Sequence, residues 1–278
     1  MDRGPLLHAH QLADFTQPLM LDVRWYLDGR DGYQSYLNGH YPGAVFVDLD
    51  LVATAADRPA AGRHPLPSPE HFVKAIATLG VEPQRQVIVM DDVRGSVAAR
   101  VWWMLDALGI EAYVLGEGLD SLNDVVLCKA PCDSTPASPW PSPRDTWPEH
   151  SIVTTNELES DPSRFFLLDA RARARYLGDE EPIDRVGGHI PGATSLPWSE
   201  ILDLLASKRW QLSPLIQDIL ANDRVPVAYC GSGVTACTLI LAFRTLGRDV
   251  KLYPPSYSGW SSDPAHPICR VDCGHNID

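Results

Sequence analysis

The chain lacks any long hydrophobic run and has no surplus of basic residues. No stretch of eighteen apolar residues occurs in its 278 residues, so the sequence predicts no membrane-spanning helix. Its N-terminus has no basic segment followed by an apolar core, so we expect no secretory signal. The net charge of −13 disfavours nucleic-acid binding, which depends on the neutralisation of phosphates by lysine and arginine.

Cysteine is also scarce, with six residues in the chain. Without a secretory signal, this content predicts a cytoplasmic protein with reduced thiols. Cys128 and Cys132, and likewise Cys269 and Cys273, are separated by three residues. A zinc site built from these four cysteines is one alternative and a redox-active pair in the C-terminal tail is the favoured one. No metal or cofactor is expected in the active site.

The sequence contains two copies of one pattern. Residues 21–24 (LDVR) correspond to 168–171 (LDAR), and residues 39–44 (GHYPGA) correspond to 188–193 (GHIPGA). Further along, residues 97–109 (VAARVWWMLDALG) correspond to 234–247 (VTACTLILAFRTLG). Three matches in the same order predict a duplicated domain. We place the first domain at 1–127, a proline-rich linker at 128–148 and the second domain at 149–278.

Strand and helix patterns alternate within each copy. The apolar runs Val87–Met90 and Val225–Tyr229 are typical of buried strands, and Phe72–Leu79 and Ile201–Ala206 are typical of helices. This order predicts an α/β fold in which each domain has a mainly parallel sheet flanked by helices. Reactive groups are then expected beyond the carboxyl ends of the strands.

Cys230 is the candidate nucleophile, because it follows a strand and precedes a helix-like segment. The loop after it is rich in small residues, and its amide groups and the helix dipole favour a thiolate. A buried cysteine beside a tight turn is the alternative. Cysteine-dependent phosphatases need an arginine six positions after the nucleophile, where this chain has Ala236. No basic residue lies between Cys230 and Arg244, which suits a persulfide better than a phosphoryl group.

The segment Cys-Gly-Ser-Gly-Val-Thr-Ala at 230–236 resembles the active-site loop of the 3-mercaptopyruvate sulfurtransferases, within the rhodanese superfamily. The resemblance implies two tandem rhodanese-like domains and a persulfide on Cys230. It also implies roles for the remaining loop residues, with Ser232 catalytic and with Gly231, Gly233, Val234 and Thr235 binding the substrate. Asp91 occupies the place of Cys230 in the first copy, which is therefore expected to be non-catalytic.

The same resemblance implies arginines that bind a substrate carboxylate. Arg175, followed by Tyr176 and Gly178, matches the first family arginine. The second is expected after Pro182, where this chain has Ile183, and Arg185 is the candidate replacement.

The family also uses an acid–histidine pair from its first domain. His40 matches the histidine, and Asp31 is the candidate acid. A structural role for His40 is the alternative, because His189 holds the same place in the second copy.

A further departure from the family pattern lies at 253–257, where Tyr-Pro-Pro-Ser-Tyr replaces Tyr-Asp-Gly-Ser-Trp. Two prolines remove two backbone donors, so we expect this edge of the site to be reshaped.

These observations predict a sulfurtransferase that moves sulfane sulfur from a mercaptopyruvate-like small molecule to a thiol, thioredoxin or cyanide. Two alternatives stay open. One is a thiosulfate sulfurtransferase, and the other is a sulfur-relay or binding module that does not turn over a small donor.

Overall fold

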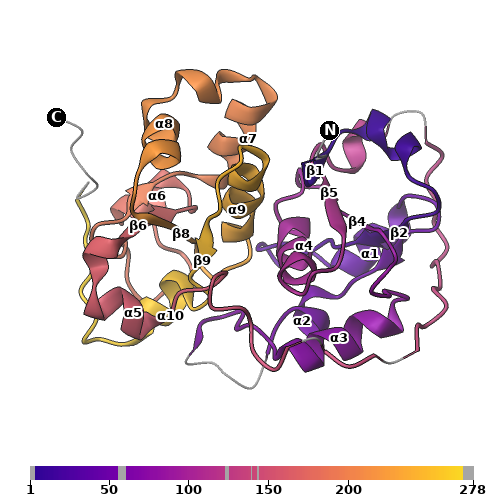
Figure 1. The fold of residues 1–278 in the computed structure, drawn as a ribbon, viewed down its shortest axis with the longest axis horizontal. Coiled ribbons are helices and arrows are strands. Elements are labelled where there is room, and N and C mark those ends of the chain that lie inside the picture. The colour runs from indigo at the N-terminus through magenta and orange to yellow at the C-terminus, as the bar shows by residue number, and fades with distance from the viewer. Residues whose placement is uncertain (1–3, 56–60, 123–124, 139, 143, 272–278) are drawn as a thin grey trace. The chain divides into compact units, whose positions relative to one another are not determined.

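The computed structural model describes residues 4–55, 61–122, 125–138, 140–142 and 144–271. By its internal contacts, the chain divides into two compact units (Figure 1). The first unit is Met1–Ala55 with Leu66–Pro148, and the second is Glu149–Asp278 together with the segment Ala56–Pro65. Residues 56–65 lie within the predicted first domain of 1–127, but they belong to the second unit by their contacts.

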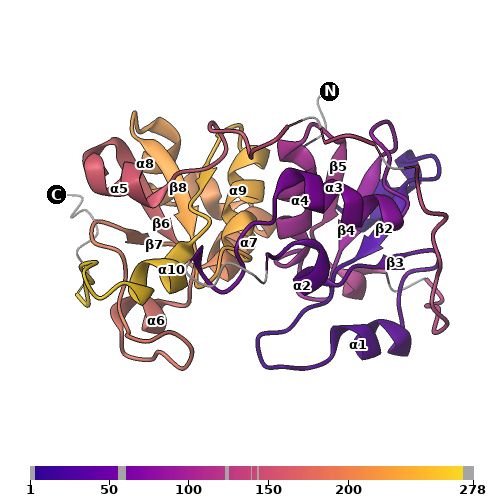
Figure 2. The ribbon, with the colours of Figure 1, turned by 90° about the horizontal axis from the view of Figure 1, so that it is seen from below.

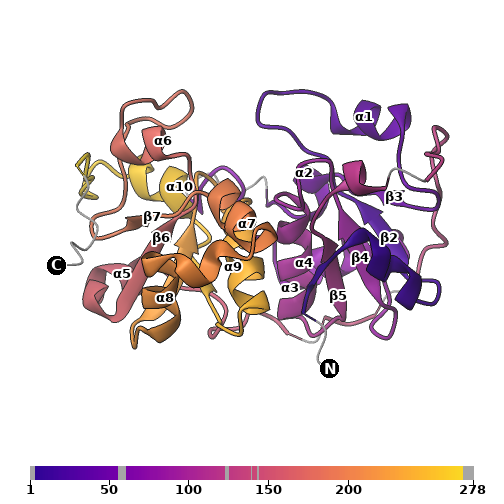
Figure 3. The same ribbon diagram turned by 90° about the horizontal axis from the view of Figure 1, so that it is seen from above.

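The first unit is built on a parallel sheet with the strand order β1-β5-β4-β2-β3. Its strands are β1 (Leu6–Leu7), β2 (Leu19–Asp22), β3 (Val45–Phe46), β4 (Val87–Met90) and β5 (Ala112–Leu115). Its helices are η1 (Ala9–Asp14), α1 (Gly32–Asn38), α2 (Leu49–Val52), α3 (Pro69–Thr78), α4 (Ala98–Ala107) and η3 (Leu119–Ser121). Helix α4 packs against β4 and β5, as Figure 1 and Figure 3 show.

The second unit has a parallel sheet with the strand order β7-β6-β8-β9. Its strands are β6 (Phe165–Asp169), β7 (Thr194–Ser195), β8 (Val225–Tyr229) and β9 (Lys251–Leu252). Its helices are α5 (Thr155–Ser160), η4 (Pro162–Arg164), α6 (Arg173–Leu177), α7 (Trp198–Ala206), η5 (Arg209–Leu212), α8 (Pro214–Ala221), α9 (Ala236–Thr245) and α10 (Ser256–Ser262).

The two sheets share one topology, which is the structural form of the sequence repeat. An isolated parallel bridge from Ile152 to Leu252 extends the second sheet beside β9, as β1 extends the first beside β5. Helix α9 packs on β8 and β9 as α4 packs on β4 and β5. The predicted α/β fold with two parallel sheets flanked by helices is confirmed.

The strands form where the sequence has short apolar runs. Every residue of β4 and of β6 is buried, as expected for strands covered on both faces. The predicted strands at Val87–Met90 and Val225–Tyr229 match β4 and β8 exactly in extent. Helix α3 begins at Pro69, where Ser68 accepts a hydrogen bond from the His71 amide in the manner of an N-cap.

The proline-rich segment follows the surface of the first unit. The Ala137 amide donates to the Ala77 carbonyl, and the indole of Trp147 donates to the Pro67 carbonyl over 2.7 Å. Among the described residues, no helix is both long enough and apolar enough to cross a bilayer.

Candidate active site

Cys230 lies directly after β8, at the carboxyl end of a central strand of the second sheet. Its side chain is 3 % exposed, and its Sγ accepts a hydrogen bond of 3.1 Å from the Gly233 amide. Gly233 has a φ of +86°, a left-handed conformation that glycine adopts without strain. The sulfur therefore lies over its own loop, with the Gly233 N–H directed towards it.

Helix α10 holds this loop from its other side. The amides of Tyr257 and Ser258 donate to the carbonyl oxygens of Cys230 and Gly231, over 3.0 and 2.9 Å. Ser256, with a φ of +53°, accepts a hydrogen bond from the Cys230 amide through its Oγ. The edge that follows Pro254 and Pro255 thus supports the loop backbone, and Figure 2 shows α10 in this region.

Two guanidinium groups lie against the residue that follows the cysteine. A Cβ placed on Gly231 would be 2.8 Å from Nη2 of Arg63 and 3.4 Å from Nη1 of Arg175. Any side chain at position 231 would therefore displace an arginine. The sequence analysis found no cation within the loop, but the fold brings two to it from elsewhere in the chain.

These arginines belong to a partly buried cluster of alternating charge. Arg175 donates to Glu181 over 2.7 Å and to Asp184 over 2.8 Å, and Arg63 is also paired with Asp184. Arg171 is bonded through two nitrogens to Asp169, and it also reaches Glu181. The cluster contains three arginines and three acids, so its formal charge is zero.

Burial and ion pairing shift the pKa values of the two carboxyls nearest the loop in opposite directions. For Asp184, burial outweighs the attraction of Arg63 and raises the pKa above the ordinary value. For Glu181, burial is outweighed by hydrogen bonds from Arg175 and from the backbone amides of Asp184 and Ile183, and the pKa is lowered. Burial therefore favours the protonated form of Asp184, whereas the hydrogen bonds to Glu181 favour its ionised form.

A histidine from the 61–65 segment completes the site. His64 Nδ1 and Ser232 Oγ are 2.7 Å apart, and both side chains are buried. The segment is fixed in place because the Arg63 amide donates to Ser258 Oγ and Gly62 has no room for a Cβ beside the Pro255 carbonyl. An imidazole is thus hydrogen-bonded to the hydroxyl two residues beyond Cys230.

The histidine and acid predicted from the sequence lie in the first unit and make local contacts. His40 stacks on Tyr36 and bonds its carbonyl oxygen, just as His189 stacks on Tyr176 and bonds its carbonyl oxygen. Asp31 caps the start of α1 by accepting from the Gln34 amide. The histidine that the structure brings to Ser232 is His64, and the repeated contacts of His40 and His189 favour a structural role for both.

Of the remaining residues predicted to bind the substrate, some lie at the Cys230 loop and others support the elements around it. Arg175 lies at the loop, whereas Arg185 donates from Nε to the Ser261 carbonyl of α10. Ile183, at the position of the second family arginine, is 36 % exposed. Val234 is buried and Thr235 precedes α9, so both form the junction between the loop and that helix.

The equivalent loop of the first unit is filled by its own carboxylate. Asp91 accepts four hydrogen bonds of 2.7–2.9 Å from the amides of Val93, Gly95, Val97 and Ala98. Its side chain is fully buried, so the nest of amides in this copy is closed to a ligand. Burial raises the pKa of Asp91, whereas the four amide hydrogen bonds act in the opposite direction and favour the anion. Only the second copy carries sulfur at this place.

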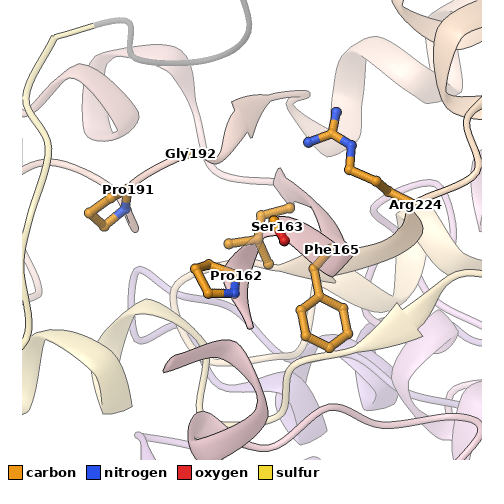
Figure 4. Close-up of a pocket in the computed structure, with 7 residues that line it drawn as sticks. Pro162, Ser163, Phe165, Pro191, Gly192 and Arg224 are labelled. Carbon is orange, nitrogen blue, oxygen red and sulfur yellow. The ribbon is translucent and has the colours of Figure 1, made fainter. Parts of the chain in front are cut away.

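A hollow in the second unit lies apart from Cys230. It is lined by Pro162, Ser163, Phe165, Leu167, Pro191, Gly192 and Arg224 (Figure 4). Phe165 begins β6 and Arg224 precedes β8, so this hollow is at the amino ends of the strands, opposite the edge that carries Cys230. Ligands of parallel α/β sheets bind at the carboxyl ends, so the hollow is not the reactive centre.

Sequence reasoning missed Arg63 and His64, although a signal for them was present. The family resemblance selected His40, whose counterpart His189 makes the same contacts, as expected for a histidine that supports the fold of each copy. In contrast, Gly-Arg-His-Pro at 62–65 has no counterpart in the second copy. Residues that break a repeat are better candidates for function than residues that maintain it.

The chain is similar to known proteins along both of its copies. The model of the rhodanese-like domain matches residues 8–124 and 154–263, one match in each copy. A Mycobacterium tuberculosis protein with the name "Putative thiosulfate sulfurtransferase SseB" is 37 % identical over 278 residues, covering 95 % of this chain and 96 % of that protein. The human 3-mercaptopyruvate sulfurtransferase is 35 % identical over 260 residues, covering 88 % of this chain and 85 % of its own length.

Solved structures show the same fold. The crystal structure of the 3-mercaptopyruvate sulfurtransferase SseA from Escherichia coli has a TM-score of 0.74 at 29 % identity, covering 92 % of this chain and all of that one. A 3-mercaptopyruvate sulfurtransferase from Leishmania major has a TM-score of 0.78 at 25 % identity, covering 93 % of this chain and 74 % of that one.

Proposed function

The chain belongs to the rhodanese family and is a sulfurtransferase, and we propose that it takes sulfur from a 3-mercaptopyruvate-like donor onto Cys230. One observation carries the choice of donor class. Nη atoms of Arg63 and Arg175 converge on Gly231, next to the nucleophile, in a place where a carboxylate can accept hydrogen bonds from both. A 2-oxo acid thiol carries such a carboxylate beside its reactive end.

The first half-reaction forms a persulfide. The Cys230 thiolate attacks the donor sulfur, the donor carbon–sulfur bond breaks, and its electron pair passes into the enolate of pyruvate. The donor thiol loses its proton and the enolate carbon gains one, so pyruvate leaves and the atoms balance. We assign this proton transfer to the hydrogen-bonded pair of His64 and Ser232, because a histidine exchanges protons near neutral pH.

The loop amide stabilises the sulfur anions of this cycle. The Gly233 amide already donates to Cys230 Sγ, and a preorganised donor needs no rearrangement when charge develops. In the second half-reaction, an acceptor thiolate attacks the outer sulfur and regenerates the Cys230 thiolate. A thiol-type acceptor follows from the family, and thioredoxin or cyanide in that role stays a prediction, as does a cytoplasmic location.

The charges of the cluster sum to zero, so the site has no net positive charge that would bind any anion. Arg63 and Arg175 are each paired with Asp184, so a bound carboxylate must compete with an internal one. A thiosulfate dianion costs more to desolvate at a site without net positive charge than a monoanionic oxo acid does. This argument favours mercaptopyruvate over thiosulfate as the donor.

A steady-state assay of pyruvate release tests the proposal. We expect turnover with 3-mercaptopyruvate to exceed turnover with thiosulfate, and Cys230→Ser to abolish both. Cys237→Ser is the matched control, because its sulfur lies in α9 and contacts the Gly233 carbonyl rather than the open side of the loop. Faster turnover with thiosulfate would favour the alternative donor, and rapid protein-to-protein sulfur transfer without pyruvate release would favour a relay.

A further inference from the structure

The repeated histidine of the first unit lies beside two cysteines that the proposed reaction does not use. His40 and Cys128 form an isolated antiparallel bridge, with reciprocal amide–carbonyl hydrogen bonds of 2.9 Å. His189 and Cys269 form the same bridge in the second unit. The duplication therefore includes the first cysteine of each Cys-x-x-x-Cys pair as well as the two histidines.

The environment of His40 fixes which ring nitrogen carries the hydrogen. The ring is fully buried and stacks on Tyr36 with a centroid distance of 3.7 Å, and its Nδ1 is 2.9 Å from the Tyr36 carbonyl oxygen. A carbonyl oxygen can only accept, so Nδ1 holds the hydrogen and Nε2 presents its lone pair. A backbone carbonyl on Nδ1 is the usual support for a histidine that ligates a metal through Nε2.

That lone pair faces sulfur. Nε2 of His40 is 3.3 Å from Cys132 Sγ, and the donor atoms of His40, Cys128 and Cys132 all lie within 4.8 Å of one another. Cys132 is held by a hydrogen bond of 2.9 Å from its amide to the Tyr36 hydroxyl. The Tyr36 hydroxyl in turn donates to the Ala44 carbonyl over 2.8 Å.

We propose that His40, Cys128 and Cys132 form a binding site for Zn²⁺. Imidazole and thiolate are the ligands that zinc prefers, at about 2.0–2.1 Å for nitrogen and about 2.3 Å for sulfur. Tetrahedral angles then require separations of roughly 3.6 Å between nitrogen and sulfur and roughly 3.8 Å between the sulfurs. The observed nitrogen–sulfur distance of 3.3 Å is close to the first of these values. Small rotations of the cysteine side chains would bring the other ligand atoms to the required separations.

Charge balance supports the same assignment. Binding converts two thiols to thiolates and releases two protons, and two thiolates with one neutral imidazole cancel the charge of the ion. Both cysteines are half-buried, so the fourth position faces solvent and can hold water. The ion would join the segment after the first unit's sheet to the connection between α1 and β3, and it would shield both thiols from oxidation.

This set of ligands differs from both alternatives raised by the sequence. A zinc site built from four cysteines needs Cys269, which is disulfide-bonded, and Cys273, which lies outside the described residues. The histidine ligand was not recognised because the bridge between His40 and Cys128 spans most of the first domain in sequence.

Titration of the reduced full-length protein with Co²⁺ tests the site. The Cys230→Ser form is used as the parent, so that the nucleophile cannot contribute sulfur ligation. We expect one equivalent of Co²⁺ to give thiolate-to-metal absorption in the near ultraviolet and intense tetrahedral bands in the visible, both displaced by Zn²⁺. Cys132→Ser should lower the affinity for Co²⁺ at least tenfold. It should also reduce the near-ultraviolet absorption by the contribution of one thiolate ligand.

Cys269→Ser, the counterpart in the second unit, is the matched control and should leave the spectrum unchanged. Zn²⁺ should also raise the melting temperature of the parent and not that of Cys132→Ser, whose circular dichroism reports whether it folds. The proposal is overturned if the parent binds no Co²⁺, or if Cys132→Ser binds it as tightly as the parent. Peptide mapping that finds only a Cys128–Cys132 disulfide, with no ion bound after reduction, would also overturn it.

Discussion

His64 and Ser232 are joined by a hydrogen bond of 2.7 Å although 168 residues separate them in sequence. Ser232 belongs to the loop of Cys230, and His64 belongs to the only described segment that leaves the first half of the chain to join the second unit. The pair lies where a proton must be moved if a thiol gives up its sulfur to Cys230. This relationship supports a catalytic assignment for His64.

Replacement of His64 by asparagine should lower kcat about 100-fold with 3-mercaptopyruvate, which is the lower range for loss of a general acid–base group. The expected cause is slower proton transfer, so KM should change little and the pH dependence of kcat should flatten. His71→Gln removes an exposed histidine near the start of α3 and is the matched control. Equal effects of the two substitutions would show that His64 has no special role.

The losses of kcat caused by Ser232→Ala and by His64→Asn should be much less than additive in a double-mutant cycle. The reason is that the two groups act as one unit. The measurement is kcat for each single variant and for the double variant. Additive losses would mean that the hydrogen bond between them does not participate in turnover.

Arg63→Ala should raise KM for 3-mercaptopyruvate roughly 10- to 100-fold, since one charge-assisted hydrogen bond to a carboxylate contributes about 1.5–3 kcal/mol. Arg175→Ala should act in the same direction. Arg30→Ala removes an exposed guanidinium paired with Asp28 and should leave KM unchanged. If Arg63→Ala has no effect on KM, the carboxylate is bound elsewhere.

Asp184→Asn should lower KM for anionic donors, because it removes the internal carboxylate that pairs with both arginines. Burial raises the pKa of Asp184, so in the wild type the same charge is lost as the pH falls. The advantage of the variant should therefore be largest at neutral pH and shrink towards acid pH. A KM ratio that does not vary with pH would contradict this reading.

Asp91→Asn should destabilise the first unit by about 3 kcal/mol, because an amide group would bring N–H donors towards amides that now bond a carboxylate. Denaturant unfolding measures this loss, and pyruvate release per folded molecule should stay near the wild-type value. Unchanged stability would mean that the four hydrogen bonds contribute little. Asp91→Cys should not create a second active site, since Arg63 and Arg175 belong to the second unit and contact the Cys230 loop there.

The fold was largely predictable because the sequence contains it twice. Short apolar runs at Val87–Met90 and Val225–Tyr229 specify central strands, and the repeated order of motifs specifies one topology for both sheets. Ser68 and Pro69 mark the start of α3 through local hydrogen bonding. Features of this kind depend on neighbours in sequence and can be read without coordinates.

The site was predictable only where its residues lie together in sequence. Cys230, Ser232 and Gly233 occupy one loop, and Arg175 follows a family pattern. Arg63 and His64 reach the loop through a tertiary contact of the 61–65 segment, which no periodicity or spacing reports. The ion pair between Arg63 and Asp184 could not be predicted for the same reason, because it forms only in the folded chain.

The central claim is that the Cys230 sulfur, held by the Gly233 amide and flanked by Arg63 and Arg175, carries the transferred sulfur. Mass spectrometry of the full-length protein after brief exposure to 3-mercaptopyruvate tests it most directly. We predict one added sulfur atom per chain, located on the peptide that contains Cys230 and removed by a thiol acceptor with regeneration of the free thiol. Added sulfur on a different cysteine, or continued pyruvate release by Cys230→Ser, would contradict the account.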